Sequence, residues 1–120
     1  MFPDQEPEPE VIIPQYKLII TYDVLPSSHE SYFQFVMSEL LPTLQEVGVY
    51  MTEAWHTAFG NYPMRMASFV AEDLETLDDL LESDTWAELE AQFKLYIRNY
   101  SVAVIPYRQG FQFVKNQVAD

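Results

Sequence analysis

The sequence of 120 residues predicts one α+β domain in which the elements follow the order strand, helix, strand, strand, helix, strand. Segments rich in β-branched and aromatic residues alternate with segments in which apolar residues recur every three or four positions. The first pattern is typical of strands and the second of helices. A Gly-Asn-Tyr-Pro sequence at residues 60–63 separates the two middle strands and is typical of a hairpin connection.

Four segments have the composition of strands, and they are residues 16–22, 49–59, 64–72 and 101–107. The two middle strands alternate in polarity on either side of the turn, so we expect Phe59 to pair with Met64 across it. The alternation at 111–114 predicts a further short edge segment.

A helix is expected between the first two strands, because Ser27 and Glu30 have the spacing of a capping box. Pro42 lies inside this helix and predicts a kink, since proline lacks the N–H that would bond the preceding turn. Gly48 is expected to end the helix in a left-handed conformation. The predicted buried stripe consists of Phe33, Val36, Leu40, Leu44 and Val47.

Two helical segments are expected after the hairpin. Asp73 is a predicted N-cap for a short helix that carries Leu74, Leu77, Leu80 and Leu81. Thr85 and Glu88 form a second predicted capping box, which begins a longer helix over residues 85–100. The buried side of this longer helix is predicted to hold Trp86, Leu89, Phe93 and Ile97.

This order predicts a ferredoxin-like βαββαβ fold, in which a four-stranded antiparallel sheet carries its helices on one face. The domain is expected to cover residues 15–114. An acidic, proline-rich tail is expected at 1–14 and a short C-terminal tail at 115–120. The first tail lacks the basic start and apolar stretch of a signal peptide, so a cytoplasmic location is expected.

Charge and composition exclude several classes of function. The chain has 19 acidic and 6 basic residues and a formal net charge of −13, so nucleic-acid binding is not expected. Without an apolar run of about 18 residues, no membrane span is expected. The absence of cysteine removes disulfides, thiolate metal sites and cysteine nucleophiles.

The predicted hairpin register divides the side chains of the middle strands between two faces. The first face is predicted to carry Met51, Trp55, Phe59, Met64, Met66 and Val70, with Glu53 as its one charge. The second is predicted to carry Tyr50, Thr52, Ala54, His56, Ala58, Arg65, Ala67 and Phe69. Neither set has the charged composition of a solvated face, and the helices cover only one. We therefore expect a homodimer formed by sheet-to-sheet packing.

The candidate ligand-binding residues are Tyr50, His56, Arg65 and Phe69, which the register places on one face beside three alanines. His56 is the candidate catalytic acid or base, and Arg65 would stabilise negative charge on a ligand. The alternative is a structural histidine that is hydrogen-bonded within a sheet interface.

No metal or cofactor is expected. His29 and His56 each lack a second histidine at ligand spacing, and alternation in a strand places Glu53 and His56 on opposite faces. The glycine-rich motifs that bind nucleotide phosphates and the Gly-x-Ser-x-Gly motif of hydrolases are absent from the sequence.

Three motifs carry a family resemblance: Trp55-His56-Thr57-Ala58-Phe59-Gly60, Leu77-Asp78-Asp79-Leu80 and Ser83-Asp84-Thr85-Trp86. With the order of elements, they resemble the dimeric α+β barrel superfamily, which includes antibiotic-biosynthesis-monooxygenase-like, NIPSNAP and stress-responsive barrel proteins. The NIPSNAP-type domains are the most similar. The resemblance implies a small homodimer with a cavity between sheet and helices in each subunit.

Haem-degrading members of this superfamily bind iron through a helix histidine, and the predicted helix 85–100 has none. Two classes of function therefore remain open. The first is a homodimer that binds a small molecule between sheet and helices. The alternative is a cofactor-independent monooxygenase or isomerase that acts on an aromatic or polyketide-like substrate.

Overall fold

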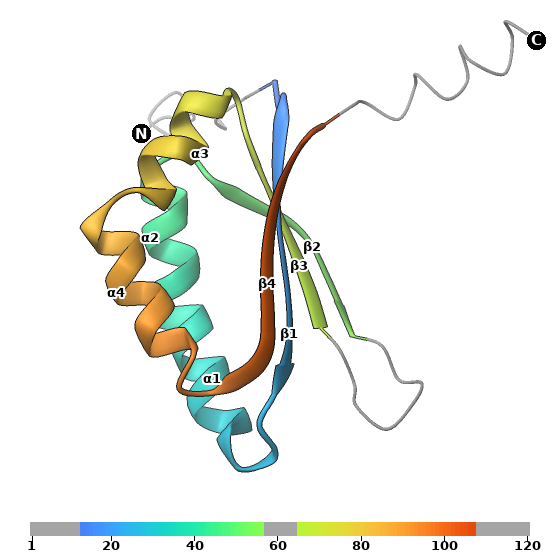
Figure 1. Cartoon of the computed structure of the whole chain (residues 1–120), viewed down its shortest axis with the longest axis vertical. Coiled ribbons are helices and arrows are strands. Elements are labelled where there is room, and N and C mark those ends of the chain that lie inside the picture. The colour runs from blue at the N-terminus through green and yellow to red at the C-terminus, as the bar shows by residue number, and fades with distance from the viewer. Residues whose placement is uncertain (1–12, 57–64, 108–120) are drawn as a thin grey trace, which may run out of the picture.

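The computed structural model describes residues 13–56 and 65–107 (Figure 1). Within these ranges the chain forms a four-stranded antiparallel sheet with the strand order β2-β3-β1-β4. The strands are β1 (Tyr16–Val24), β2 (Tyr50–His56), β3 (Arg65–Ala71) and β4 (Ile97–Pro106). This antiparallel order, with a helical crossover on each side of the β2–β3 pair, confirms the predicted ferredoxin-like α+β fold.

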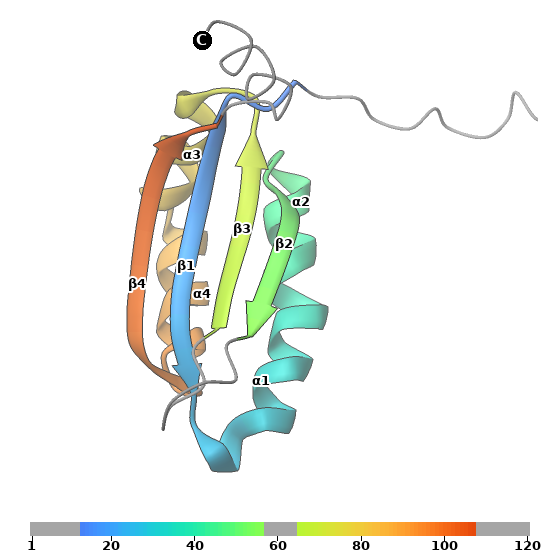
Figure 2. The ribbon, with the colours of Figure 1, turned by 90° about the vertical axis from the view of Figure 1, so that its right-hand side faces the viewer.

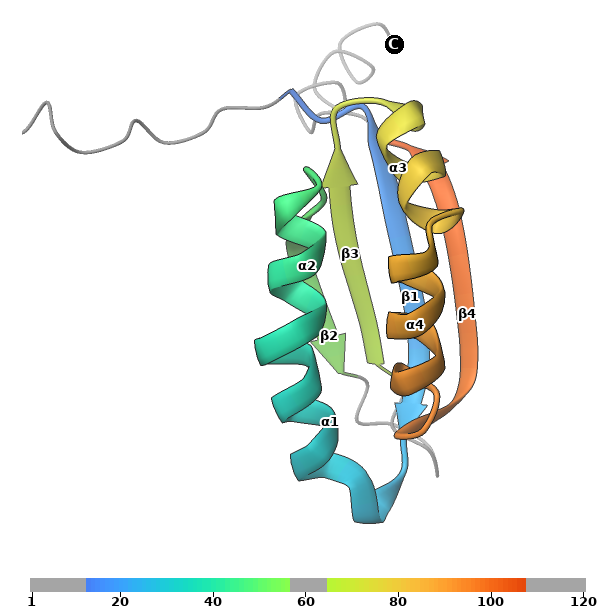
Figure 3. The ribbon, with the colours of Figure 1, turned by 90° about the vertical axis from the view of Figure 1, so that its left-hand side faces the viewer.

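The helices pack on one face of the sheet, as Figures 1 and 2 show. They are α1 (His29–Phe35), α2 (Leu41–Glu46), α3 (Leu74–Leu81) and α4 (Asp84–Phe93). Figure 3 shows the α1–α2 arm in front of β2 and α4 in front of β1. The core lies between these two layers and includes the inward side chains of β1, which are Leu18, Ile20 and Tyr22. No described helix is long and apolar enough to cross a bilayer.

The first helical arm comprises the elements from Pro26 to Glu46, and its start differs from the predicted one. A 3-10 turn at Pro26–Ser28 precedes α1, and no side-chain hydrogen bond caps either element. The predicted capping box of Ser27 and Glu30 is therefore wrong. Proline at the first position of the turn fixes φ in the helical range, which starts the turn without a capping side chain.

A π-helical turn, Val36–Leu40, joins α1 to α2. It contains one residue more than an α-helical turn, and the N–H of Leu41 donates to the carbonyl of Val36. The turn lies just before Pro42, so the irregularity predicted from that proline takes this form. The missing N–H of proline releases a carbonyl from the α-helical pattern, which favours the wider turn.

The extra residue changes which side chains of this arm are buried. The buried residues are Tyr32, Phe35, Leu40 and Leu44, whereas the predicted Phe33 and Val47 are 59% and 48% exposed. A single uninterrupted period cannot describe both halves of the arm, because the π turn rotates one half against the other. Leu40 and Leu44 are the fully correct part of the predicted stripe, and Val36 is half-buried.

Gly48 ends α2 as predicted, with a φ of 88°. Its N–H donates to the carbonyl of Gln45 at 3.1 Å, and the N–H of Val49 donates to that of Leu44 at 2.9 Å. These two bonds form a Schellman motif, which satisfies carbonyls that the helix end would otherwise leave unpaired.

The second helical arm consists of α3 and α4, and the residues that cap these helices are partly as predicted. Asp73 caps α3 and accepts a hydrogen bond from the N–H of Thr76 at 2.8 Å, as expected. For α4 the cap is Ser83, which accepts from the N–H of Trp86 at 3.0 Å, so the predicted box of Thr85 and Glu88 is wrong. A serine with extended backbone two residues earlier already satisfies the first free N–H groups.

The predicted helix over 85–100 is also too long, because α4 ends at Phe93 and β4 begins at Ile97. Asn99 has a φ of 57°, which no regular helix contains, and its side-chain amide donates to Asp23 at 2.6 Å. This bond lies where the pairing of β4 with β1 shifts, with Asn99 and Tyr100 of β4 opposite the single residue between Thr21 and Asp23. The predicted strand therefore starts earlier, while Ile97 is buried as expected.

Some predictions concern residues outside the described ranges. They are the pairing of Phe59 with Met64, the turn at 60–63, the edge segment at 111–114, residues 1–12 of the N-terminal tail and the whole C-terminal tail.

We predict that Gly48→Ala lowers the free energy of unfolding by about 1 kcal/mol, because a Cβ atom disfavours positive φ. The loss comes from backbone strain, since an added Cβ would meet only Thr76 Cγ2, at 3.8 Å. Gly48→Asn should lose less, because asparagine tolerates this conformation. Urea unfolding of the three proteins measures the effect, and equal stability of the alanine variant and the wild type would contradict it.

Candidate functional site

A cavity of about 340 Å³ lies between the sheet and the first helical arm. The sheet contributes Ile20, Met51, Ala54, Ala67 and Phe69 to its lining. The helical side contributes Phe33, Val36, Met37, Leu40, Leu41 and Phe93. The polar members of the lining are Tyr22, Tyr32 and Arg65. The lining formed by the described residues is therefore mostly apolar, with three polar side chains.

Two local features of the sequence make room for this cavity. Ala54 of β2 lies opposite Ala67 of β3, so two side chains that end at Cβ line the cavity there. The π turn supplies Val36, Met37 and Leu40 to the wall, and π turns occur frequently at functional sites. Phe33 and Met37 are both exposed and lining, so the cavity opens to the surface beside α1 and the π turn.

The polar groups form one connected cluster. The hydroxyls of Tyr22 and Tyr32 share a hydrogen bond of 2.6 Å, and either oxygen can be its donor. The guanidinium carbon of Arg65 lies 5.3 Å from the ring centroid of Tyr32, a cation–π distance. The cluster thus joins β1, α1 and β3 at one part of the lining.

Burial raises the pKa of the Tyr22 phenol well above its usual value, and the hydrogen bond with Tyr32 raises it further. The positive charge of Arg65 opposes this shift by lowering the pKa, which indicates that the guanidinium acts on the phenol. Tyr22 is therefore a neutral phenol at physiological pH.

The predicted ligand-binding residues fall in three different places. Arg65 and Phe69 line the cavity. His56 lies opposite Arg65 on the same face of the sheet, but it is exposed and is not part of the lining. Tyr50 pairs with Val70 and therefore faces the opposite side, so its predicted place on the face of His56 is wrong.

A β-bulge explains the error for Tyr50. Between Met51 and Glu53 the pairing of β2 with β3 shifts by one residue, which reverses the alternation for the residues before Thr52. Met51 consequently faces the cavity, although it was expected on the other face. A pairing of Phe59 with Met64 would place His56 opposite Ala67, whereas the described partner is Arg65.

The sequence interpretation did not select Tyr22 and Tyr32 as site residues. The signal for Tyr22 was present, because it alternates with Leu18 and Ile20 on the inward face of β1. Tyr32 shares a buried face with Phe35. The predicted stripe missed this face because one uninterrupted helical period was continued through the π turn.

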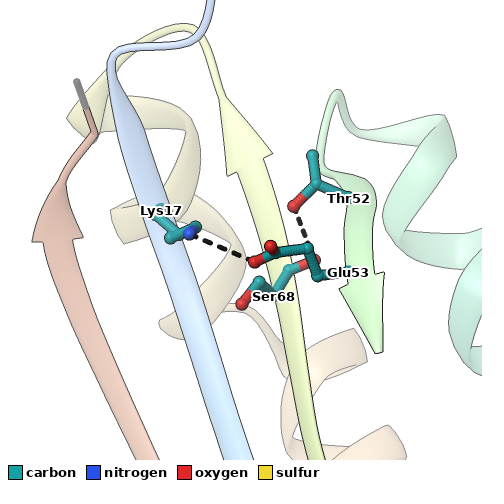
Figure 4. A network of polar contacts seen from close by, with 4 residues as sticks. All are labelled: Lys17, Thr52, Glu53 and Ser68. Carbon is teal, nitrogen blue, oxygen red and sulfur yellow. Dashed lines mark hydrogen bonds and ion pairs between the residues drawn. The ribbon is translucent and has the colours of Figure 1, made fainter. Parts of the chain in front are cut away.

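The outer face of the sheet carries a second polar cluster (Figure 4). The Lys17 ammonium lies 3.5 Å from a Glu53 carboxylate oxygen, and the Thr52 hydroxyl donates to the carbonyl of Ser68 at 3.2 Å. The Ser68 hydroxyl is buried and has no described hydrogen-bond partner. As predicted, Glu53 shares this face with Trp55.

In the part of the chain that the structure covers, no three histidine or acidic side chains gather as metal ligands. The described chemistry of the cavity is therefore that of two phenols and one guanidinium.

The sequence matches no protein-family model and no curated protein. Solved structures do match the fold of this chain. This chain has the fold of NIPSNAP proteins. An uncharacterised NIPSNAP domain protein from Burkholderia xenovorans superposes with a TM-score of 0.60 at 11% identity, over 80% of this chain and 96% of that chain. A NIPSNAP family protein from Agrobacterium tumefaciens gives 0.59 at 13% identity, over 81% and 95%.

A candidate antibiotic biosynthesis monooxygenase from Chloroflexus aurantiacus also matches, with a TM-score of 0.51 at 11% identity over 80% of this chain and 95% of that chain. These neighbours confirm the structural resemblance to NIPSNAP and antibiotic-biosynthesis-monooxygenase-like domains. At such low identity the likeness concerns the fold alone.

We predict that stability falls as the pH rises above about 10, the ordinary pKa of tyrosine, because the unfolded phenol then ionises while the folded Tyr22 phenol holds its proton. Below pH 10 the protonated Tyr22 phenol contributes fully to the free energy of unfolding. Tyr22→Phe should flatten the decline, and at pH 7 it should cost about 1 kcal/mol for the lost hydrogen bond.

Urea unfolding between pH 7 and 11 measures both effects. Some alkaline decline should persist in the variant, because burial and the hydrogen bond to Glu90 also raise the pKa of Tyr100. An identical pH dependence in the variant and the wild type would contradict the assignment to Tyr22.

Proposed function

We propose that the protein binds a small, largely apolar molecule in the cavity between the sheet and the first helical arm. The observation that carries this proposal is the cavity itself, whose volume of about 340 Å³ lies in the range of small-molecule sites. Its lining combines a continuous apolar surface with a few convergent polar groups, the usual composition of a ligand pocket.

The lining favours an adaptable fit to the apolar part of the ligand. Met37 of the helical arm and Met51 of the sheet are both members of the lining. Methionine side chains are unbranched and polarisable, so they adjust to differently shaped apolar groups. The aromatic rings of Phe33, Phe69 and Phe93 suit an aromatic or flat apolar group.

We also propose that the protein is a homodimer formed through the outer face of the sheet. No helix of the described ranges covers this face, and Trp55 is 58% exposed there. Ile105, Ala103 and Ser101 of β4 pair with outward residues of β1 and extend the same weakly polar surface. A two-fold axis would bury this surface against its own copy.

A second candidate function is a cofactor-independent monooxygenase or isomerase with an aromatic or polyketide-like substrate. The observation that favours it is Arg65, because a guanidinium in an apolar lining stabilises a developing enolate. The monooxygenase designation of the Chloroflexus aurantiacus protein supports the same chemistry. In this function His56, opposite Arg65, would be the proton acceptor.

We predict that Ala54→Phe prevents binding of N-phenyl-1-naphthylamine, a neutral apolar fluorophore, by filling the cavity from its floor. Ala91→Phe is the matched control, because Ala91 is an exposed residue of α4 outside the lining. The expected dissociation constant rises at least about tenfold for Ala54→Phe, equivalent to about 1.4 kcal/mol. Wild-type affinity in both variants would contradict the proposed site.

We predict that Trp55→Glu converts the dimer into a monomer, since a carboxylate buried without a partner in the interface would be strongly disfavoured. Leu95→Glu is the control, because Leu95 is 68% exposed in the turn after α4. Light scattering on gel-filtered protein gives the molar mass. A monomeric wild type, or a dimeric Trp55→Glu variant, would contradict the sheet-to-sheet interface.

A further inference from the structure

We propose that the ligand is an organic monoanion whose carboxylate binds at Arg65 and the Tyr22–Tyr32 pair, while an aromatic or aliphatic body fills the apolar remainder of the cavity. This inference rests on the proposed function and names the class of molecule that the same site takes. It follows from the hydrogen-bonding capacity, the charge and the position of the three polar groups.

The phenol pair offers a hydrogen that no described residue accepts. Two phenols carry two hydroxyl hydrogens, and the bond of 2.6 Å between Tyr22 and Tyr32 uses one of them. The second hydrogen has no other acceptor among the described side chains and carbonyls. Both residues line the cavity, so the unused hydrogen is available to an acceptor atom of the ligand.

Arg65 adds donors of the same kind. A guanidinium has five N–H groups and accepts no hydrogen bond, and a cation–π contact with the Tyr32 ring uses none of these groups as a donor to an oxygen. No described carboxylate lies within ion-pair distance of Arg65, whereas the Lys17 ammonium lies 3.5 Å from a carboxylate oxygen of Glu53. Together the three side chains thus form a cluster in which hydrogens exceed acceptors.

The negative net charge of the chain makes a cation without a described acidic partner, such as Arg65, unusual. With 19 acidic and 6 basic residues, the molecule repels anions over most of its surface, and most cations would be expected to have an acidic neighbour. Arg65 is instead partly buried against an aromatic ring and an apolar lining. A carboxylate would supply both the missing negative charge and the missing acceptors, in the bidentate geometry that arginine favours.

The arrangement also orients the ligand. The remaining members of the lining within the described ranges have no side-chain oxygen or nitrogen, so the described lining provides a single polar region. A dianion or a strongly polar molecule would leave its second polar group without a partner, which is costly in an apolar environment. An amphipathic monoanion satisfies the whole lining.

The test compares 2-naphthoate with 2-naphthamide, which have the same shape but differ in charge, by displacement of N-phenyl-1-naphthylamine. The wild type should bind the naphthoate at least about tenfold more tightly, as expected for a charge-assisted hydrogen-bond pair. In Arg65→Met the ratio of the two dissociation constants should fall to about one. Lys94→Met, which removes a cation from the Tyr100 ring outside the cavity, should keep the wild-type ratio.

The ratio within one variant cancels any general weakening of the cavity, so a partly destabilised Arg65→Met protein still gives a clear result. The double variant Tyr22→Phe/Tyr32→Phe should lower the ratio by about fivefold, because it removes both phenol donors and leaves the charge, whereas either single variant still leaves one hydroxyl hydrogen for the carboxylate. This inference would be overturned, and the proposed function would stand, if the wild type binds the fluorophore but binds the naphthoate no more tightly than the naphthamide. A wild-type protein that does not bind the fluorophore would overturn both.

Discussion

Phe93 joins the two helical arms to the sheet, and the arrangement of the described core depends on its burial. It is the last residue of α4, and its ring centroid lies 4.9 Å from that of Tyr22 on β1 and 6.0 Å from that of Phe35 on α1. The Tyr100 ring of β4 lies against it at 5.9 Å. Four elements therefore meet at one side chain, which fixes the separation of helices and sheet.

The candidate site is built from this same cluster. Tyr22 and Tyr32 pack against Phe93 with their rings, share a hydrogen bond through their hydroxyls, and both line the cavity. The polar groups are consequently held by the core and by each other. Such support limits the movement of a binding group, and a group with little movement loses little entropy when a ligand is bound.

The sequence predicts the fold well because the fold depends on patterns that repeat over many residues. Alternation in β1 and the three- and four-residue steps of the helices survive one local irregularity. The candidate site is less predictable, because two single-residue insertions decide it. The bulge near Thr52 exchanges the faces of Tyr50 and Met51, and the π turn brings Tyr32 to the buried side. Neither insertion leaves a periodic signal, since each is visible only against the partner element.

A crystal structure of the protein grown with 2-naphthoate would show whether the cavity binds an amphipathic monoanion. We expect density for the ring system between the helical arm and the sheet, with the carboxylate at about 3 Å from Arg65 and from a hydroxyl of the Tyr22–Tyr32 pair. Density for the naphthoate elsewhere on the molecule, with the cavity closed by its own side chains, would contradict it.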